Sequence, residues 1–261
     1  MKVTVLGAGS WGTTLALVLN QNNHSVTCWS VVKNDIESIL TYKENKKFLP
    51  GINIPDTINF TDNLQESVDF ADIIIVAIPS HAVRPVIQGI DLSEKTDLIW
   101  VNVAKGIENQ TLLRVSQVIE EVGHVPAENV CVLFGPSHAE EVSREIPTAI
   151  VSASKSQKTA TMVQHLFMTP YFRVYANLDI IGVELGNGML SEGLLQATSD
   201  RMRIQARPIH KLMFLIILMN LDLHPQNDRT ICLFHPPTNL ARVQKSLRRN
   251  PLLIVAYTHG Y

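Results

Sequence analysis

The feature that most constrains the fold of this chain is a glycine-rich turn close to its N-terminus. The turn has the sequence GAGSWG at residues 7–12 and directly follows a short β-branched run at Val3–Leu6. Residues 13–21 carry apolar side chains at helical spacing, and a second strand pattern follows at His24–Trp29. Strand, glycine turn, helix and strand within about 30 residues is the order of a βαβ unit.

Each glycine of the turn has a separate physical role in such a unit. Gly7 allows the tight turn out of the strand, Gly9 lets the backbone approach a pyrophosphate, and Gly12 lets the helix pack closely on the sheet. The helix start at Ser10 and Trp11 then offers N–H groups and a positive dipole end to the phosphates. We therefore expect dinucleotide binding, with a purely structural glycine turn as the alternative.

Further along the chain, apolar runs typical of buried strands alternate with segments of helical periodicity. We expect strands at residues 72–78, 98–104, 130–134 and 148–152, and helices at residues 82–90, 111–122, 139–144 and 157–167. This alternation predicts an α/β fold with an open, mostly parallel Rossmann-type sheet covered by helices on both faces. We expect this dinucleotide-binding domain to span residues 1–186.

Composition argues against several other classes of protein. The 261-residue chain has a formal net charge of −2, which gives no signal for nucleic acid. Its longest apolar run, residues 212–219, is far below the ~20 residues that cross a bilayer, so we expect no membrane insertion. The start of the chain shows no signal-peptide pattern, and we expect a cytoplasmic location. The widely spaced Cys28, Cys131 and Cys232 indicate buried thiols in a reducing compartment and no metal site.

The end of the second predicted strand bears on which dinucleotide fits. A NAD-specific site carries Asp or Glu there to accept hydrogen bonds from the ribose hydroxyls, but residues 28–33 contain no acid. Lys33 is placed to meet a 2′-phosphate, which favours NADP or mixed use. A solvated surface lysine is the equally weighted alternative.

Two further segments follow predicted strands, at the edge where open α/β sheets bind ligands. Lys105 lies just past the predicted strand at residues 98–104, where a cation can hold an anionic substrate or polarise a carbonyl. Ser137 follows the next strand and is expected to cap a helix, with Glu140 as its capping-box partner. That helix start either binds an anion or is merely well capped. His138 beside it suggests an acid/base role, although such histidines are more often structural.

Five motifs follow one another in order along residues 1–186. They are GAGSWGTTLA at 7–16, FLPGINIPDTI at 48–58, VNVAKGIE at 101–108, GPSHAEEV at 135–142 and VYANLDIIGVELG at 174–186. Together they resemble the bacterial NAD(P)-dependent glycerol-3-phosphate dehydrogenases. The resemblance implies NAD or NADP as cofactor and a small phosphorylated three-carbon substrate. The family reduces dihydroxyacetone phosphate to sn-glycerol 3-phosphate, which feeds phospholipid synthesis in lipid metabolism.

The resemblance also assigns roles to individual positions. It implies that the cofactor is contacted by the glycine turn and by Ser10, Trp11, Val31, Lys105 and Ala139, and the substrate by Lys105, Gly135 and Ser137. Many members carry a basic residue at the position of Val31, so this contact is weakened here. The resemblance further implies an all-helical substrate domain after the first. A homodimer is a further expectation for the partners of the chain.

The sequence pattern changes abruptly at Gly186. Residues 1–186 carry a net charge of −7, whereas residues 187–261 carry +5. The family has a general acid/base lysine shortly after this point, but here the next lysine is Lys211, so the catalytic residue is not assigned. We expect residues 187–261 to form a truncated or divergent segment, partly disordered, with a helix at 190–206 and an apolar stretch at 212–221.

These observations leave three hypotheses for function. The first is a glycerol-3-phosphate dehydrogenase, impaired in this chain. The second is a catalytically inactive nucleotide-binding remnant, produced by a shifted reading frame or by an error in gene prediction past codon 186. The third is a dehydrogenase of another Rossmann family, which explains the glycine turn but not the KGIE and GPSHAEE segments.

Overall fold

The computed structural model describes residues 1–93, 95 and 97–186, together with the short strands 232–234 and 255–257. The chain divides into two units, Met1–Ala197 and Thr198–Tyr261. Every residue that the sequence places in a candidate site belongs to the first unit. The domain boundary predicted at Gly186 lies eleven residues before the division between the units.

The first unit is built on one sheet of eight strands. Their bounds are β1 Lys2–Leu6, β2 Ser25–Trp29, β5 Ile58–Thr61, β6 Ile73–Val76, β7 Ile99–Asn102, β8 Val130–Phe134, β9 Thr148–Ser154 and β10 Phe172–Asn177. They lie side by side in the order β10-β9-β8-β7-β6-β1-β2-β5, and all neighbours are parallel except β8 and β9. The six strands from β5 to β8 have the order of a Rossmann sheet, which confirms the predicted fold class.

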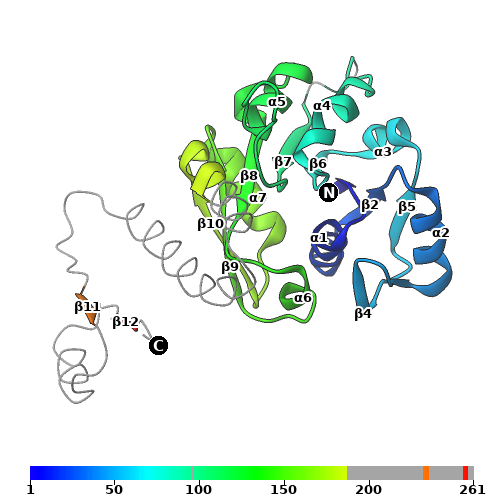
Figure 1. Ribbon diagram of the computed structural model, residues 1–261, viewed down its shortest axis with the longest axis horizontal. Helices are drawn as coiled ribbons and strands as arrows, with labels where there is room; N and C mark the ends of the chain where they lie inside the picture. The colour runs from blue at the N-terminus through cyan, green and yellow to red at the C-terminus, as the bar shows by residue number, and fades with distance from the viewer. Residues whose placement is uncertain (94, 96, 187–231, 235–254, 258–261) are drawn as a thin grey trace. The chain divides into compact units, whose positions relative to one another are not determined.

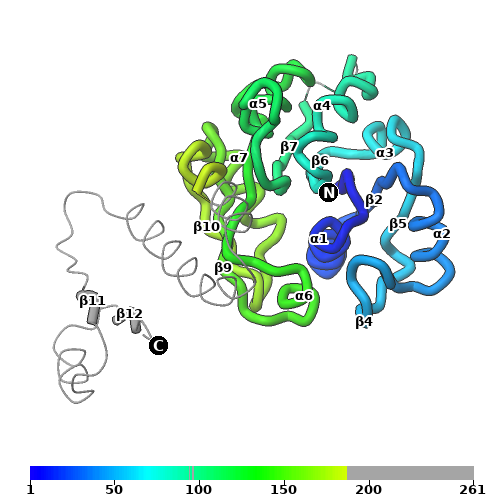
Figure 2. Tube along the Cα trace, viewed as in Figure 1, coloured from blue at the N-terminus to red at the C-terminus, as the bar shows by residue number. Residues whose placement is uncertain are grey.

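Helices cover both faces of this sheet (Figure 1). Their bounds are α1 Ser10–Gln21, α2 Lys33–Tyr42, α3 Leu64–Phe70, α4 Ser80–Gln88, α5 Val115–Val122, α6 Ala139–Val142 and α7 Gln157–Phe167, with a 3₁₀ turn at Ala127–Asn129. Helices α1, α6 and α7 lie on one face, and α3, α4 and α5 on the other (Figure 1). A small hairpin of β3, Glu44–Asn45, and β4, Leu49–Asn53, follows α2, as the trace in Figure 2 shows.

The core explains why the apolar runs of the sequence are continuous. All four residues of β6 are fully buried, because this strand lies in the middle of the sheet with helices on both faces. Cys28 in β2 and Cys131 in β8 are buried free thiols, as predicted. Burial raises the pKa of Cys28 to about 12 and also raises that of Cys131. The side chain of Cys232 lies outside the described part of the chain.

Helix α5 begins later than its sequence pattern predicts. The predicted helix starts at residue 111, but α5 starts at Val115. The reason is a turn before the helix, in which Leu112 has a left-handed φ of 59° and Ile107 forms an isolated antiparallel bridge with Arg114. This turn closes the loop that carries Lys105.

In the second unit, β11, Cys232–Phe234, pairs in parallel with β12, Val255–Tyr257. The predicted helix at 190–206, the apolar stretch at 212–221 and the expected partial disorder of the segment 187–261 fall outside the described residues. Within the described ranges, no helix is long and apolar enough to cross a membrane.

Candidate functional site

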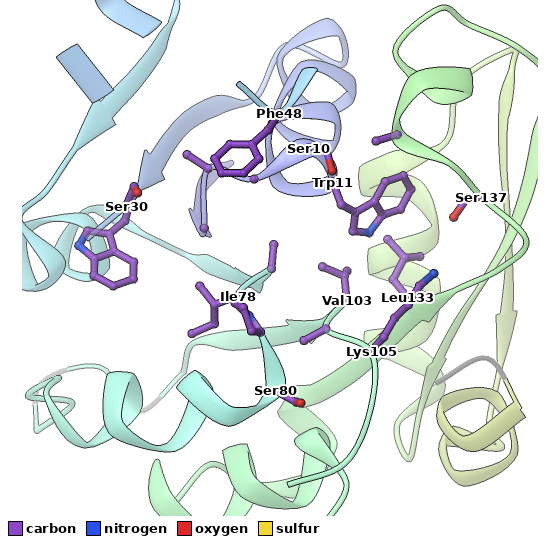
Figure 3. Close-up of a pocket in the computed structure, with 18 of the residues that line it drawn as sticks. Ser10, Trp11, Ser30, Phe48, Ile78, Ser80, Val103, Lys105, Leu133 and Ser137 are labelled. Carbon is purple, nitrogen blue, oxygen red and sulfur yellow. The ribbon is translucent and has the colours of Figure 1, made fainter. Parts of the chain in front are cut away.

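A pocket of about 1020 Å³ lies at the carboxyl ends of the parallel strands β1, β2, β6, β7 and β8. In Figure 3, Ser30 lies at one end of this pocket, Lys105 and Ser137 at the other, and Ser10 and Trp11 between them. Ten residues are expected from the glycine turn and the family resemblance to contact the cofactor or the substrate, and nine of them line it: Gly7, Gly9, Ser10, Trp11, Val31, Lys105, Gly135, Ser137 and Ala139. The tenth, Gly12, is buried in α1 and is not among the residues that line the pocket.

Packing requires two of the three glycines of the turn. Gly7 has φ +117°, and a Cβ there would lie 2.6 Å from the carbonyl oxygen of Ala77, beyond the end of β6. A Cβ on Gly12 would lie 1.9 Å from the carbonyl oxygen of Gly7. Both distances are far inside van der Waals contact, so glycine alone lets α1 start this close to the sheet.

Gly9 is different, because the protein itself leaves room for a side chain there. A Cβ on Gly9 would meet nothing within 4 Å, and Gly9 lines the pocket. It is the N-cap of α1, and its carbonyl oxygen accepts the first helical hydrogen bond, from Thr13 N–H at 3.0 Å. The N–H groups of residues 10–12 therefore precede the helical ladder, as at any helix start. A backbone open on this side, at a helix start, fits a dinucleotide pyrophosphate.

A buried asparagine, which sequence reasoning missed, holds the turn in place. Asn45 in β3 donates from Nδ2 to the carbonyl oxygen of Ala8 and to Thr13 Oγ1, each at 2.9 Å. Thr14 Oγ1 lies 2.9 Å from the carbonyl oxygen of Ser10 and 3.3 Å from that of Ala139, so it links α1 to the start of α6. Asn45 gives no sequence signal, because it resembles any polar loop residue.

At the end of the pocket where Ser30 lies, the structure does not support one prediction. Lys33 was placed to meet a 2′-phosphate, but it is exposed and is not among the residues that line the pocket. The surface-lysine alternative therefore fits Lys33 better. Two other charged residues line this end instead, Asp35 and Lys47, and they form an ion pair with Nζ 2.9 Å from Oδ2.

The loop that carries Lys105 is anchored by Glu108. Arg84 in α4 forms a bidentate pair with this carboxylate, Nε to Oε1 at 2.8 Å and Nη2 to Oε2 at 2.9 Å. Thr111 Oγ1 donates to Oε2 at 2.5 Å. The hydrogen bonds from Arg84, with that from Thr111, hold the pKa of Glu108 below its usual range.

A second anchor of the same loop is Glu184, in the helical residues 180–186. Its side chain is 3% exposed and accepts four hydrogen bonds: from Asn102 Nδ2 at 3.0 Å, Arg114 Nη1 at 2.6 Å, Ser116 N–H at 2.9 Å and Ser116 Oγ at 2.6 Å. Asn102 ends β7, three residues before Lys105. Sequence reasoning missed Glu184, although an acidic residue within a pattern of apolar residues at helical spacing was a signal for a buried carboxylate.

The segment after β8 contradicts the predicted capping box. The N-cap of α6 is His138, without a side-chain cap, and Ser137 Oγ donates instead to the carbonyl oxygen of Gly135 at 3.3 Å. The Ser137 N–H donates to the same oxygen at 2.8 Å, so the chain turns back too tightly for this hydroxyl to reach the helix. A Cβ on Gly135 would lie 2.8 Å from Ala149 O, which makes glycine necessary in the turn.

Comparison with known proteins identifies relatives of this chain. The sequence model of the NAD-dependent glycerol-3-phosphate dehydrogenase N-terminus matches residues 2–160. A glycerol-3-phosphate dehydrogenase of Thermoanaerobacter sp. (strain X514) is 47% identical over 189 residues, which cover 72% of this chain and 56% of that protein. One from Agathobacter rectalis is 40% identical over 227 residues, which cover 84% of this chain and 67% of that protein.

The fold has a solved counterpart as well. The crystal structure of glycerol-3-phosphate dehydrogenase from Coxiella burnetii aligns with a TM-score of 0.67 and 29% identity, over 84% of this chain and 68% of that one. Residues 1–186 are less than three quarters of the chain, so the sequence alignment with the Agathobacter rectalis protein includes residues beyond Gly186. The chain spans little more than half the length of the Thermoanaerobacter relative.

Proposed function

Because this chain belongs to the NAD-dependent glycerol-3-phosphate dehydrogenase family, we propose that it binds NAD or NADP along the pocket and uses it to interconvert dihydroxyacetone phosphate and sn-glycerol 3-phosphate. The supporting observation is that segments far apart in the sequence line one pocket at the edge where Rossmann sheets bind dinucleotides.

In this proposal the glycine turn and the start of α1 hold the pyrophosphate. Gly9 leaves room for the phosphate oxygens, and the N–H groups of Ser10 and Trp11 face them. Val31 covers the adenosine end, and Ala139 borders the opposite wall. Gly7 and Gly12 act indirectly, because their contacts set the position of α1.

Lys105, Gly135 and Ser137 form the substrate end. The nicotinamide ring supplies or accepts the hydride when it is bound. As the carbonyl is reduced, negative charge builds on its oxygen, and the Lys105 ammonium group stabilises that charge. Gly135 and Ser137 border the same part of the pocket, where the substrate phosphate needs hydrogen-bond donors.

A second candidate is nucleotide binding with little turnover. The observation that favours it is the sequence after Gly186, in which no lysine occurs before Lys211. Loss of one general acid/base lowers rates by about 10²-fold or more. The two candidates share the cofactor site and differ in the proton transfer.

Two measurements on the full-length chain separate these candidates. Fluorescence titration with NADH and NADPH measures binding, and oxidation of NADH with dihydroxyacetone phosphate measures turnover. Binding with turnover supports the first candidate, binding without turnover supports the second, and absence of binding overturns both.

Lys105→Ala tests the substrate end of the proposal. We expect it to weaken use of dihydroxyacetone phosphate in whatever activity is measured. Lys155→Ala is the matched control, because Lys155 pairs with Glu120 on the surface and does not line the pocket. Unchanged kinetics in Lys105→Ala would remove this lysine from the site.

The proposal extends to the setting of the protein. We place it in the cytoplasm, in glycerophospholipid synthesis, as a homodimer. The free buried thiols of Cys28 and Cys131 suit a reducing compartment. Cell fractionation and sedimentation velocity test these two points, and a monomer or an extracytoplasmic protein would contradict them.

A further inference from the structure

An ion pair at the adenosine end of the pocket has no role in the function proposed above. Asp35 lies in the first turn of α2, and Lys47 lies between β3 and β4. Lys47 Nζ is 3.1 Å from Asp35 Oδ1 and 2.9 Å from Oδ2. Among the described lining residues between Trp29 and Phe48, these two are the only charged side chains.

The position of the pair in the fold gives it a specific ligand atom to meet. In a Rossmann fold the adenosine ribose lies at the end of the second strand, and β2 ends at Trp29. The residues that follow directly, Val31 and Val32, present apolar side chains, and Val31 is 77% exposed. Ser30 Oγ already accepts a hydrogen bond from Val32 N–H at 3.2 Å. The charged groups that can discriminate at the ribose 2′ position are therefore those of Asp35 and Lys47.

We propose that the Asp35–Lys47 ion pair sets the relative affinities of this chain for NAD and NADP, an inference that rests on the proposed cofactor site. Lys47 binds the 2′-phosphate of NADP through its ammonium group. Asp35 accepts a hydrogen bond from the 2′-hydroxyl of NAD. Because both charges lie at one place, the chain accepts both cofactors.

The exposure of the two side chains explains how one pair serves two ligands. The Lys47 side chain is 58% exposed and can swing away, whereas that of Asp35 is 18% exposed. An exposed ion pair contributes little, and a phosphate dianion is a stronger partner for an ammonium group than a single carboxylate. When Lys47 moves, the N-terminal end of the α2 dipole still stabilises the Asp35 carboxylate. The Asp35 carboxylate then repels the 2′-phosphate, so removing the charge of Asp35 favours NADP.

The test measures dissociation constants for NADH and NADPH in full-length Lys47→Met and Asp35→Asn variants. We expect Lys47→Met to weaken NADPH binding about 10-fold and to leave NADH binding within about 2-fold, the effect of losing one charge-assisted hydrogen bond. Asp35→Asn is expected to tighten NADPH binding and weaken NADH binding, which moves the ratio about 10-fold the other way. Lys47→Arg keeps the charge and should retain NADPH binding.

The matched control is a second ion pair nearby, Lys43 with Asp56, because neither of its residues lines the pocket. Lys43→Met should leave both dissociation constants unchanged. Binding of both cofactors by the wild type, with a ratio that stays within about 2-fold in both pocket variants, would overturn this inference alone. Absence of binding in the wild type would instead overturn the proposed function.

A measurement on the wild type keeps the proposal testable if a variant fails to fold. Because the extra phosphate meets an exposed ammonium group, NADPH affinity should fall more steeply with salt than NADH affinity. Equal salt dependence for the two cofactors would contradict a role for Lys47.

Discussion

The carboxylate of Glu184 offers the sharpest test of how the pocket is held together. Glu184→Ala removes the acceptor of four hydrogen bonds at once. It leaves the guanidinium of Arg114, whose side chain is 12% exposed, without its counter-charge. It also leaves the Asn102 amide and the Ser116 hydroxyl without their common acceptor.

The expected loss follows from burial. Removing one partner of a buried ion pair destabilises a protein by about 3–5 kcal/mol, because the remaining charge stays in a poorly solvated place. Since domains are stable by about 5–15 kcal/mol, Glu184→Ala should lower the urea midpoint strongly. Glu184→Gln keeps the volume and one acceptor oxygen, so we expect a smaller loss.

Tryptophan fluorescence during urea unfolding is a suitable assay. The three tryptophans of the chain, Trp11, Trp29 and Trp100, all lie in the unit Met1–Ala197, so the signal reports on the unit that holds Glu184. Trp100 is fully buried in β7, next to the strand end that Asn102 forms.

A double-mutant cycle decides whether the pair itself carries the effect. Arg114→Met alone leaves the Glu184 carboxylate without its ion-pair partner, and the double variant of Arg114→Met with Glu184→Ala removes both charges. We expect the double variant to lose less free energy of unfolding than the two single variants together. An unchanged midpoint in Glu184→Ala, or strict additivity in the cycle, would refute this account of the network.

Three further predictions follow from the described contacts. Gly12→Ala should destabilise the fold, because its Cβ would overlap a backbone oxygen at 1.9 Å. Gly9→Ala should fold normally and weaken NADH binding. Circular dichroism measures the first effect and fluorescence titration the second, and the reverse pattern would contradict the prediction. The thiols of Cys28 and Cys131 should resist alkylation at pH 8 until the unit unfolds, which peptide mass spectrometry measures. Because the pKa of Glu108 is depressed in the folded state, its carboxylate stabilises the fold above the ordinary carboxyl pKa, and this effect is lost as the pH falls through the folded pKa. The difference in unfolding free energy between the wild type and Glu108→Gln should therefore shrink in acid. A pH-independent difference would disprove this.

The elements that the sequence predicts best are those with a strong local cause. Strand β8 and helix α7 have their predicted bounds. A run of five buried apolar residues fits only a strand there, and a regular helical period fits only a helix. Helix α3 is absent from the predicted elements because its seven residues make only about two turns, although Asn63 caps it by accepting a hydrogen bond from Glu66 N–H at 3.2 Å. The cap was a usable signal that periodicity alone does not reveal.

The site is predictable where the backbone itself makes it and less so where distant side chains meet. The glycine turn could be identified because its spacing reflects contacts within one βαβ unit. The prediction that Ser137 caps α6 was wrong because the backbone turn at Gly135 overrides a local capping rule. Lys47 replaces Lys33 at the pocket because a hairpin brings it there, which no local pattern encodes. Asn45 and Glu184 act across the fold for the same reason.

Glu184 precedes, by two residues, the point at which the composition of the chain changes. The bonds that it accepts come from β7 and from the start of α5, so the clamp on the Lys105 loop closes entirely inside the stretch that matches the family motifs. A different segment could therefore be fused after Gly186 without removing any of the hydrogen bonds that hold the Lys105 loop in place.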